Sequence, residues 1–295
     1  MSSEQAGPRA ARAPRGRSWR RFARNPAALL GLGLTLSFLL AALLANQLAP
    51  ANPFRSVGAP LQPPSSEFWL GTDDLGRDIF SGVVHGARTS LLVGFTVAGA
   101  SLLIGVLVGG LAGFFGGWID DMLMRFTELV LVMPRFFLAL VVVALFGASL
   151  RNLILVLALT SWEFTARLTR AGVLSTRALD YVMAARAVGR SEWSNLLKHV
   201  LPNVMAPVIA YVSLLMGSAI LIEAGLSFIG LGDPNVISWG YMLNNAQAFM
   251  RRAPWMSVFP GLAIALTVLG INLLGDGLNA YWNPRARSGL GRGRL

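Results

Sequence analysis

The stretch DYVMAARAVGRSEWSNLLKHVLPN, residues 180–203, decides the fold expected for this chain, because it is polar yet lies between two apolar segments. Its charged and titratable side chains exclude it from membrane hydrocarbon; they are Asp180, Arg186, Arg190, Glu192, Lys198 and His199. Other residues recur every three or four positions, as on one face of an α-helix: Val182, Ala185, Gly189, Trp193, Leu196 and Val200. Because glycine disfavours a continuous helix, we expect two short helices bent at Gly189, outside the membrane.

The composition favours a membrane protein. Of the 295 residues, 54% are hydrophobic and only 13% are charged, whereas a soluble domain carries about a quarter charged residues. The net charge of +11 would indicate nucleic acid binding in a soluble protein, but here the basic residues gather at segment ends, so no nucleic acid partner is expected. The absence of cysteine excludes thiolate nucleophiles, iron–sulfur clusters and Cys-ligated zinc.

Six stretches are apolar over roughly the 20 residues that a transmembrane helix requires: 27–48, 90–115, 124–147, 151–170, 204–230 and 257–280. The predicted fold class is therefore all-α and integral to the membrane, with six transmembrane helices. The predicted organisation is an Arg-rich tail (1–26), a first transmembrane helix (27–48), an extracytoplasmic loop (49–88), a core of five helices (89–282) that includes a cytoplasmic loop (171–203), and a basic tail (283–295).

The basic residues before the first span set the predicted orientation. Only Glu4 opposes a run of arginines there: Arg9, Arg12, Arg15, Arg17, Arg20, Arg21 and Arg24. The positive-inside rule places this tail, and after six crossings the C-terminus, in the cytoplasm. The same tail can bind anionic membrane lipid. A cleaved signal peptide is the alternative for residues 1–49, although the apolar run exceeds the roughly 7–15 residues usual in such peptides.

The extracytoplasmic loop contains FWLGTDDLGRDIFSGVVHGARTSL, residues 68–91. Asp73, Asp74, Arg77 and Asp78 lie close together in it, but the carboxylate spacing does not match a calcium loop, so no metal site is expected. A structural or docking role is predicted instead. The turn and cap residues Gly71, Thr72 and Gly76 indicate an ordered entry into the next helix.

Charged residues inside predicted spans are candidates for the translocation pathway, because an unpaired charge is costly in hydrocarbon. Glu128, Glu163 and Glu223 are these candidates, with local structural bonding as the alternative for Glu223. Glycines recur every fourth residue along and just past the second span, at Gly105, Gly109, Gly113 and Gly117. They predict close helix packing, with a substrate-lining groove as the alternative.

Two absences bear on chemistry. The only lysine is Lys198, and no G-x-x-x-x-G-K-[ST] phosphate loop surrounds it, so the chain does not hydrolyse ATP through such a loop. His85 and His199 fall on opposite sides of the membrane in the predicted topology, which excludes a histidine metal site or acid–base pair. No catalytic residue and no bound cofactor are therefore expected.

The stretch at 180–203 resembles the EAA loop of ABC-importer permeases, whose pattern is E-A-A, three residues, G, nine residues, I, one residue, L-P. Ala184, Ala185, Gly189, Leu201 and Pro202 match that spacing, whereas Met183 stands where the family has Glu. Three more segments are similar to the C-type permease of dipeptide, oligopeptide and nickel importers: WLGTDDLGRDIFSGVVHGAR, PNVMAPVIAYVSLLMGSAILIEAGLSFIGLG and FPGLAIALTVLGINLLGDGLN. The resemblance covers nearly all of residues 20–284.

The resemblance implies a type I importer of the bacterial inner membrane. Its parts are a second permease, two cytoplasmic ATP-binding subunits that hold ATP and Mg, and an extracytoplasmic solute-binding protein. It assigns ATPase coupling to Met183, Ala184, Ala185, Arg186, Gly189, Arg190, Leu201 and Pro202, and it makes Asp73, Asp74, Arg77 and Asp78 docking candidates. The expected substrate is a peptide, with nickel, glutathione or a sugar-derived solute left open. A stand-alone ion-coupled transporter or channel is the alternative, but neither the internal repeats nor the helices broken at corresponding positions that are usual in such carriers are seen in the sequence.

Overall fold

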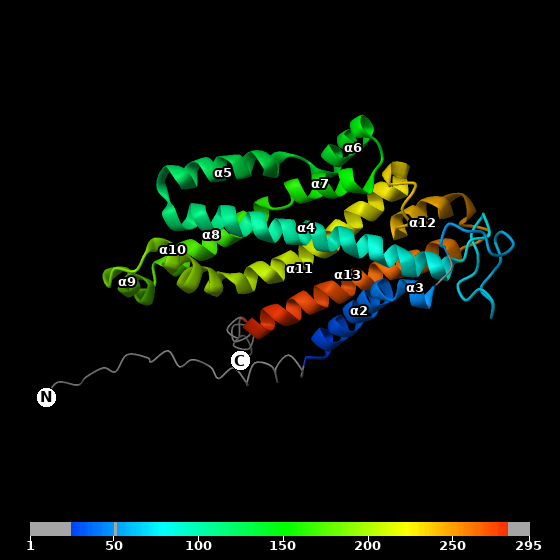
Figure 1. Ribbon diagram of the computed structural model, residues 1–295, viewed down its shortest axis with the longest axis horizontal. Helices are drawn as coiled ribbons and strands as arrows, with labels where there is room; N and C mark the ends of the chain where they lie inside the picture. The colour runs from blue at the N-terminus through cyan, green and yellow to red at the C-terminus, as the bar shows by residue number, and fades with distance from the viewer. Residues whose placement is uncertain (1–24, 50–51, 283–295) are drawn as a thin grey trace, which may run out of the picture.

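The computed structural model describes residues 25–49 and 52–282, which form an elongated bundle of helices running along its long axis (Figure 1). Within these ranges the regular structure is helical, apart from isolated bridges at Ser56–Arg77 and Thr72–Asp78. The predicted all-α class is thus confirmed for this part of the chain. The arginines of the N-terminal tail and residues 283–295 lie outside it.

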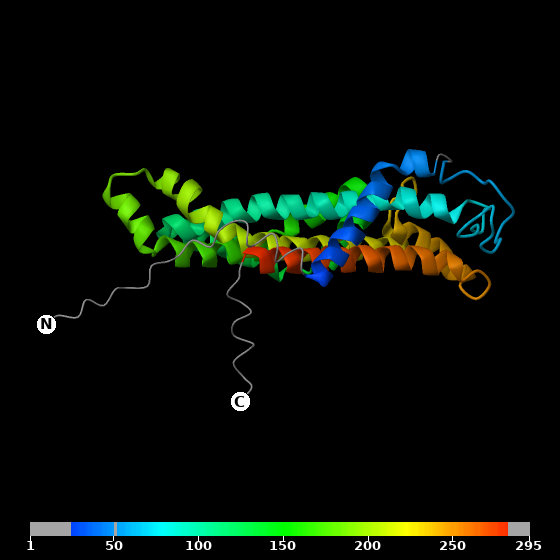
Figure 2. The same cartoon turned by 90° about the horizontal axis from the view of Figure 1, so that it is seen from below.

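The first helix, α2, runs from Pro26 to Leu43 and is followed by the short α3, Ala45–Leu48. The Asn25 side chain caps α2 by accepting a hydrogen bond from the Ala27 amide at 3.2 Å. α2 packs on the last helix, α13 (Trp255–Trp282), which it crosses obliquely (Figure 2). A Cβ at Gly31 would lie 2.6 Å from the Leu274 amide nitrogen, so only glycine allows this approach.

The second helix, α4, extends from Ile79 to Phe115 and is longer than the predicted span that begins at residue 90. Its 37 residues correspond to about 55 Å, well beyond the roughly 30 Å of hydrocarbon. The predicted loop at 49–88 is therefore helical from Ile79 onward. The predicted close packing is confirmed at Gly105, where a Cβ would lie 2.5 Å from Thr165 Cβ. Gly109 and Gly113 likewise face α8, but Gly117 has open space and begins the next helix.

The next two predicted spans are both broken helices. α5 (Gly117–Val132) and α6 (Arg135–Phe146) bend by 74° at their junction, where Pro134 cannot continue α5. α7 (Leu150–Thr160) and α8 (Glu163–Arg177) are separated at residues 161–162.

Four helical segments of the described ranges are long and apolar enough to cross a membrane, or five if the bent α5–α6 pair is one span. The predicted span at 151–170 does not exist as one helix. The count of six is accordingly not confirmed.

The polar stretch forms α9 (Asp180–Ala187), α10 (Glu192–Asn195) and the π-turn η1 (Leu196–Val200), which leads into α11 (Leu201–Leu226). Gly189 has a φ of +77°, so the predicted bend there is confirmed.

The chain then turns through η2 (Ser227–Leu231) into α12 (Trp239–Ala246) and η3 (Gln247–Phe249). We call residues 179–200 the tip, and residues 52–78 together with α12 the loop end. The two lie at opposite ends of the bundle (Figure 1).

Candidate functional site

The tip is fixed to the bundle by a few fully buried side chains. Val182 and Val200 are inaccessible and Leu196 is almost so, and all three join the main hydrophobic core beside Phe114 of α4. These contacts hold α9 and α10 as a folded projection rather than a loose loop.

Most of the apolar side chains of the tip nevertheless face outward. Exposed fractions of about half or more are found at Leu179 (48%), Tyr181 (45%), Met183 (50%), Val188 (82%), Trp193 (56%) and Leu197 (58%). Of the helical face predicted by spacing, Gly189 and Trp193 are exposed, whereas the three anchoring residues are buried. Trp193 makes an edge-on contact with Phe115 of α4, whose ring centroid lies 5.2 Å away. A concentration of apolar surface on a short segment is typical of a protein-binding site.

The predicted coupling residues all lie in or next to the tip. Met183 and Ala184 are exposed and Ala185 is half-buried. Arg186 pairs with Glu192 at 2.9 Å, and its guanidinium carbon lies 5.0 Å from the centre of the Phe114 ring.

Three further predicted residues lie at the end of the tip. Arg190 donates to the Ser194 hydroxyl at 3.1 Å and lies 2.8 Å from the His199 Nε2 atom. Leu201 and Pro202 start α11, a position at which proline is tolerated. The arginines therefore bond within the tip and leave its apolar side chains uncovered.

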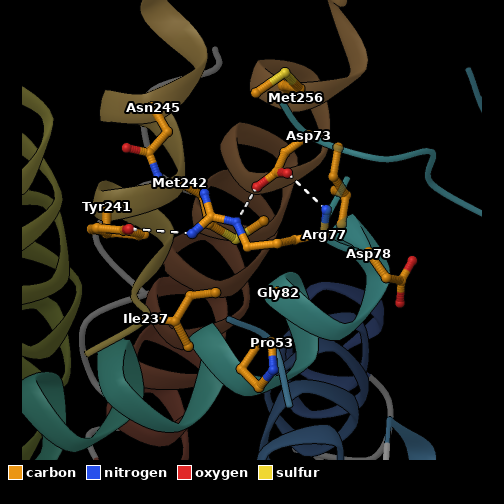
Figure 3. A pocket seen from close by; sticks show the side chains of 11 residues that line it. Pro53, Asp73, Arg77, Asp78, Gly82, Ile237, Tyr241, Met242, Asn245 and Met256 are labelled. Atoms are coloured by element: carbon orange, nitrogen blue, oxygen red, sulfur yellow. Dashed lines mark hydrogen bonds and ion pairs between the residues drawn. The ribbon is translucent and has the colours of Figure 1, made fainter. Parts of the chain in front are cut away.

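The loop end is built around an ion pair. The Arg77 Nε atom donates to Asp73 Oδ2 at 2.5 Å, and one of its terminal nitrogens donates to the Tyr241 hydroxyl at 3.4 Å. Figure 3 shows Arg77 reaching from the start of α4 toward α12, with the Asp73 carboxylate against its guanidinium. Burial alone would lower the pKa of Arg77, but its bonds to Tyr241 and Asp73 outweigh burial and raise it. The ion pair thus holds Arg77 in place within the loop, and the bond to Tyr241 joins the loop to α12.

Neighbouring residues complete this end. Thr72 is fully buried, and its hydroxyl donates to the Ala59 carbonyl at 2.7 Å and accepts from the Gln62 amide at 2.8 Å. Asp78 caps α4 by accepting from the Ser81 amide at 2.9 Å. Asp74 differs, because its Oδ1 atom is buried with no partner, and burial together with Asp73 raises its pKa.

The three pathway candidates have different surroundings. Glu128 is exposed on α5. Glu223 is buried and its Oε1 atom accepts from the hydroxyls of Ser227 at 2.8 Å and Ser238 at 2.7 Å. These bonds agree with a local structural role for Glu223, which was the alternative to a place in the translocation pathway.

Glu163, buried at the start of α8, forms an ion pair with Arg135 of α6. The sequence places Arg135 in the predicted span at 124–147 and Glu163 in the span at 151–170, but their pairing was not predicted. No cluster of metal-ligating side chains occurs among the described residues.

Comparisons with known proteins identify the family. The family described as "Binding-protein-dependent transport system inner membrane component" matches residues 105–288. The N-terminal TM domain of oligopeptide transport permease C matches residues 14–64.

Individual relatives align along nearly the whole chain. The dipeptide transport system permease protein of Alkalihalophilus pseudofirmus is 40% identical over 92% of this chain and 90% of its own length. The di/tripeptide transport system permease protein of Pseudomonas aeruginosa is 41% identical over 92% of each. The glutathione transport system permease protein of Pectobacterium atrosepticum is 38% identical over 92% of this chain and 91% of its own length. On these matches, the chain belongs to the family of inner membrane components of binding-protein-dependent transport systems.

Proposed function

We propose that this chain is one permease subunit of an ATP-driven importer and that its cargo is a short peptide. The relatives reported above carry the names of dipeptide, di/tripeptide and glutathione permeases, and glutathione is itself a tripeptide. Because the cargoes in these names are all short peptides, they support a peptide as the cargo of this chain over nickel or a sugar-derived solute. The chain forms half of the pathway, and a second permease forms the other half.

The proposed membrane arrangement has six crossings, with both termini in the cytoplasm. α5–α6 and α7–α8 then each count as one broken crossing. The tip lies in the cytoplasm and the loop end faces the solute-binding protein, which agrees with their location at opposite ends of the bundle (Figure 1). The arginines of the N-terminal tail support this orientation.

The single observation that carries the coupling proposal is the exposed apolar surface of a tip that is itself firmly anchored. Val182, Leu196 and Val200 fix the tip to the core, while Met183, Val188 and Trp193 face away from it. In the proposal this surface sits in a cleft of a cytoplasmic ATP-binding subunit. Closure of two such subunits around ATP and Mg moves the tip, and this movement changes the pathway from inward-facing to outward-facing.

The loop end is proposed as the docking platform of the solute-binding protein. Its ion pair and buried hydrogen bonds keep the shape of the platform independent of the partner, which reduces the conformational cost of docking. The docking candidates Asp73, Arg77 and Asp78 contribute by holding the platform in shape through their ion pair and hydrogen bonds. Asp74 is the remaining docking candidate; it is partly buried, and its Oδ1 atom has no hydrogen-bond partner.

Copurification tests the proposal directly. A tagged chain, expressed with its neighbouring genes and solubilised in mild detergent, is expected to bring down a second permease and two ATP-binding subunits. The reconstituted complex is expected to hydrolyse ATP faster when peptide-loaded binding protein is added. Purification of the chain alone, with uptake driven by an ion gradient and insensitive to ATP, would establish the stand-alone carrier instead.

A further inference from the structure

Two helix breaks meet in the middle of the bundle. α5 gives way to α6 after Val132, and α7 gives way to α8 at residues 161–162. The breaks are joined by the Arg135–Glu163 ion pair and by stacking of Phe126 on Trp162, with ring centroids 5.9 Å apart. Figure 1 shows the end of α5 and the start of α8 at the same level, between the tip and the loop end.

The second break is supported by specific bonds. The Ser161 carbonyl accepts a hydrogen bond from the buried Ser101 hydroxyl of α4 at 2.8 Å, and the Trp162 indole donates to the Leu159 carbonyl at 2.8 Å. Non-helical backbone at membrane depth is tolerated only where it is buried in protein or lines a polar cavity. Since the break contains neither proline nor glycine, the tertiary contacts maintain it.

The ion pair at the breaks leaves binding capacity unused. Glu163 is 1% exposed, yet its Oε2 atom has no hydrogen-bond partner. The Arg135 side chain is 25% exposed, and its guanidinium has more donors than one carboxylate oxygen can use. Tyr211 of α11 lies beside Arg135 and packs against Phe164 at 4.6 Å between ring centroids.

The position of the arginine argues against a purely structural role. Arg135 is in the first turn of α6, where the helix dipole disfavours a cation. A buried ion pair usually stabilises a protein no better than packed apolar side chains of similar size. Val132 and Met133, which precede Arg135 closely in the chain, are 80% and 49% exposed.

We propose that Arg135 and Glu163 bind the two charged ends of a zwitterionic peptide during its passage. As the pair separates on entry of the peptide, Arg135 takes the peptide carboxylate, and Glu163, whose Oε2 atom is buried without a partner in the paired state, takes the ammonium group. A zwitterion is complementary to such a pair, since both charges of the peptide are matched in a low-dielectric environment. The inference rests on the proposed function, which it refines by naming the contact residues.

Glu223 does not offer such a site. Its Oε2 atom also lacks a partner, but its Oε1 atom accepts from the hydroxyls of Ser227 and Ser238, and neither of these bonds brings a cation that would hold the peptide carboxylate. A single buried carboxylate matches only one end of a zwitterion.

A double substitution separates substrate binding from structure. Arg135→Met with Glu163→Leu removes both charges together, so no buried charge is left unpaired. The matched control is Arg170→Met with Asp120→Leu, which removes another ion pair (2.5 and 2.6 Å) between α8 and α5. Both variants are reconstituted as full complexes with binding protein loaded with tritiated dialanine, and peptide delivered per ATP hydrolysed is measured.

The expected result is a fall of roughly tenfold or more in dialanine per ATP for the first variant, the effect of about 1.4 kcal/mol of lost binding. Complex assembly stays at the wild-type level, and the control variant keeps its ratio. An unchanged ratio in the Arg135/Glu163 variant would overturn the inference. Failure of the wild-type complex to take up any peptide would instead overturn the proposed function.

A second measurement does not require transport by the variant. A photo-cross-linking residue at Val132, close to Arg135 in the chain, is expected to capture tritiated dialanine in the wild-type complex, and excess unlabelled dialanine should block capture. The same residue at Leu107, 62% exposed on α4, is the control and should capture none. Absence of labelling at Val132, or equal labelling at both positions, would contradict the inference.

Discussion

The tip and the loop end are both polar segments beyond the apolar bundle, but their bonds are distributed differently. At the loop end, Thr72, Asp73 and Arg77 direct their side chains inward to one another and to α12. At the tip, the arginines bond to close neighbours in sequence, and Met183 and Val188 are left exposed.

The loop end also exposes apolar side chains, among them Trp69 (67%) and Leu75 (58%), so the two ends differ in how they are held rather than in exposure. The side-chain bonds of the loop end reach α12, whereas those of the tip arginines stay local. This difference supports the proposal of a fixed platform at one end and a docking element at the other.

The largest expected effect on peptide uptake comes from Gly189 at the bend of the tip. Gly189→Arg should lower peptide uptake roughly tenfold or more, the effect of losing about 1.4 kcal/mol of docking, while the membrane complex still assembles. Two causes combine: the φ of +77° strains an arginine backbone, and the added bulk enters open space where the partner would sit. Uptake and ATPase activity in proteoliposomes measure the effect.

Gly189→Asn provides the matched control, because asparagine tolerates a positive φ far better than most residues. It should retain most of the uptake. Normal uptake by the arginine variant would remove the tip from the coupling mechanism.

A second substitution tests the rigidity of the loop end. Arg77→Met leaves Asp73 without its ion-pair partner in a largely buried position, at a cost of about 3 kcal/mol. We expect a lower thermal unfolding temperature and weaker binding of the solute-binding protein, measured by calorimetry and by surface plasmon resonance.

The exposed Arg55 in the same loop supplies the control, since Arg55→Met should alter neither property. Equal effects of the two substitutions would show that charge, rather than the ion pair, matters at this end.

A smaller effect is expected at Met183, where the family pattern has Glu. Because Met183 is half exposed and its two alanine neighbours are unchanged, Met183→Glu should change uptake by less than about threefold, or improve docking of the ATP-binding subunit slightly. Uptake assays and ATPase titration give the answer. A marked loss of transport would mean that the docking surface has been rebuilt around methionine.

The smallest expected effect concerns Asp74 and pH. Burial and the neighbouring Asp73 raise the pKa of Asp74 above its ordinary value of 3.8. The folded protein therefore binds this proton more readily than the unfolded chain, and the resulting stability is lost as pH rises through the raised pKa.

Asp74→Asn, which resembles the protonated form, should thus unfold at a slightly higher temperature than the wild type at pH 7. The difference should shrink as the pH approaches 4. Thermal unfolding followed across this range measures it, and a difference that is the same at every pH would contradict the assignment.

Several features could be predicted locally because their causes are local. Gly189 interrupts a helical pattern, and the chain bends there in the structure. Glycines at Gly105, Gly109 and Gly113 share one helix face, and that face meets α8. Pro134 lies inside the predicted span at 124–147, and because proline interrupts a helix it is a local signal for the break between α5 and α6.

Other features could not be predicted from periodicity. The predicted span at 151–170 is broken at Ser161–Trp162, where no residue is a helix breaker, and the free Ser161 carbonyl is satisfied by Ser101 from α4. The predicted span that begins at residue 90 is likewise shorter than α4, which begins at Ile79. The first part of α4 lacks the continuous apolar pattern of a membrane span, although Asp78 caps it as the start of a helix.

By itself, the sequence determined the class, the apolar segments, the bend in the tip and the family resemblance, since these depend on composition and on spacing within one segment. Only the tertiary structure decided which side chains of the tip stay exposed, how Arg77 joins the loop to α12, and that Arg135 meets Glu163 between two broken helices. The physical reason is that burial and ion pairing depend on distances between segments, and such distances are set by packing of the whole bundle.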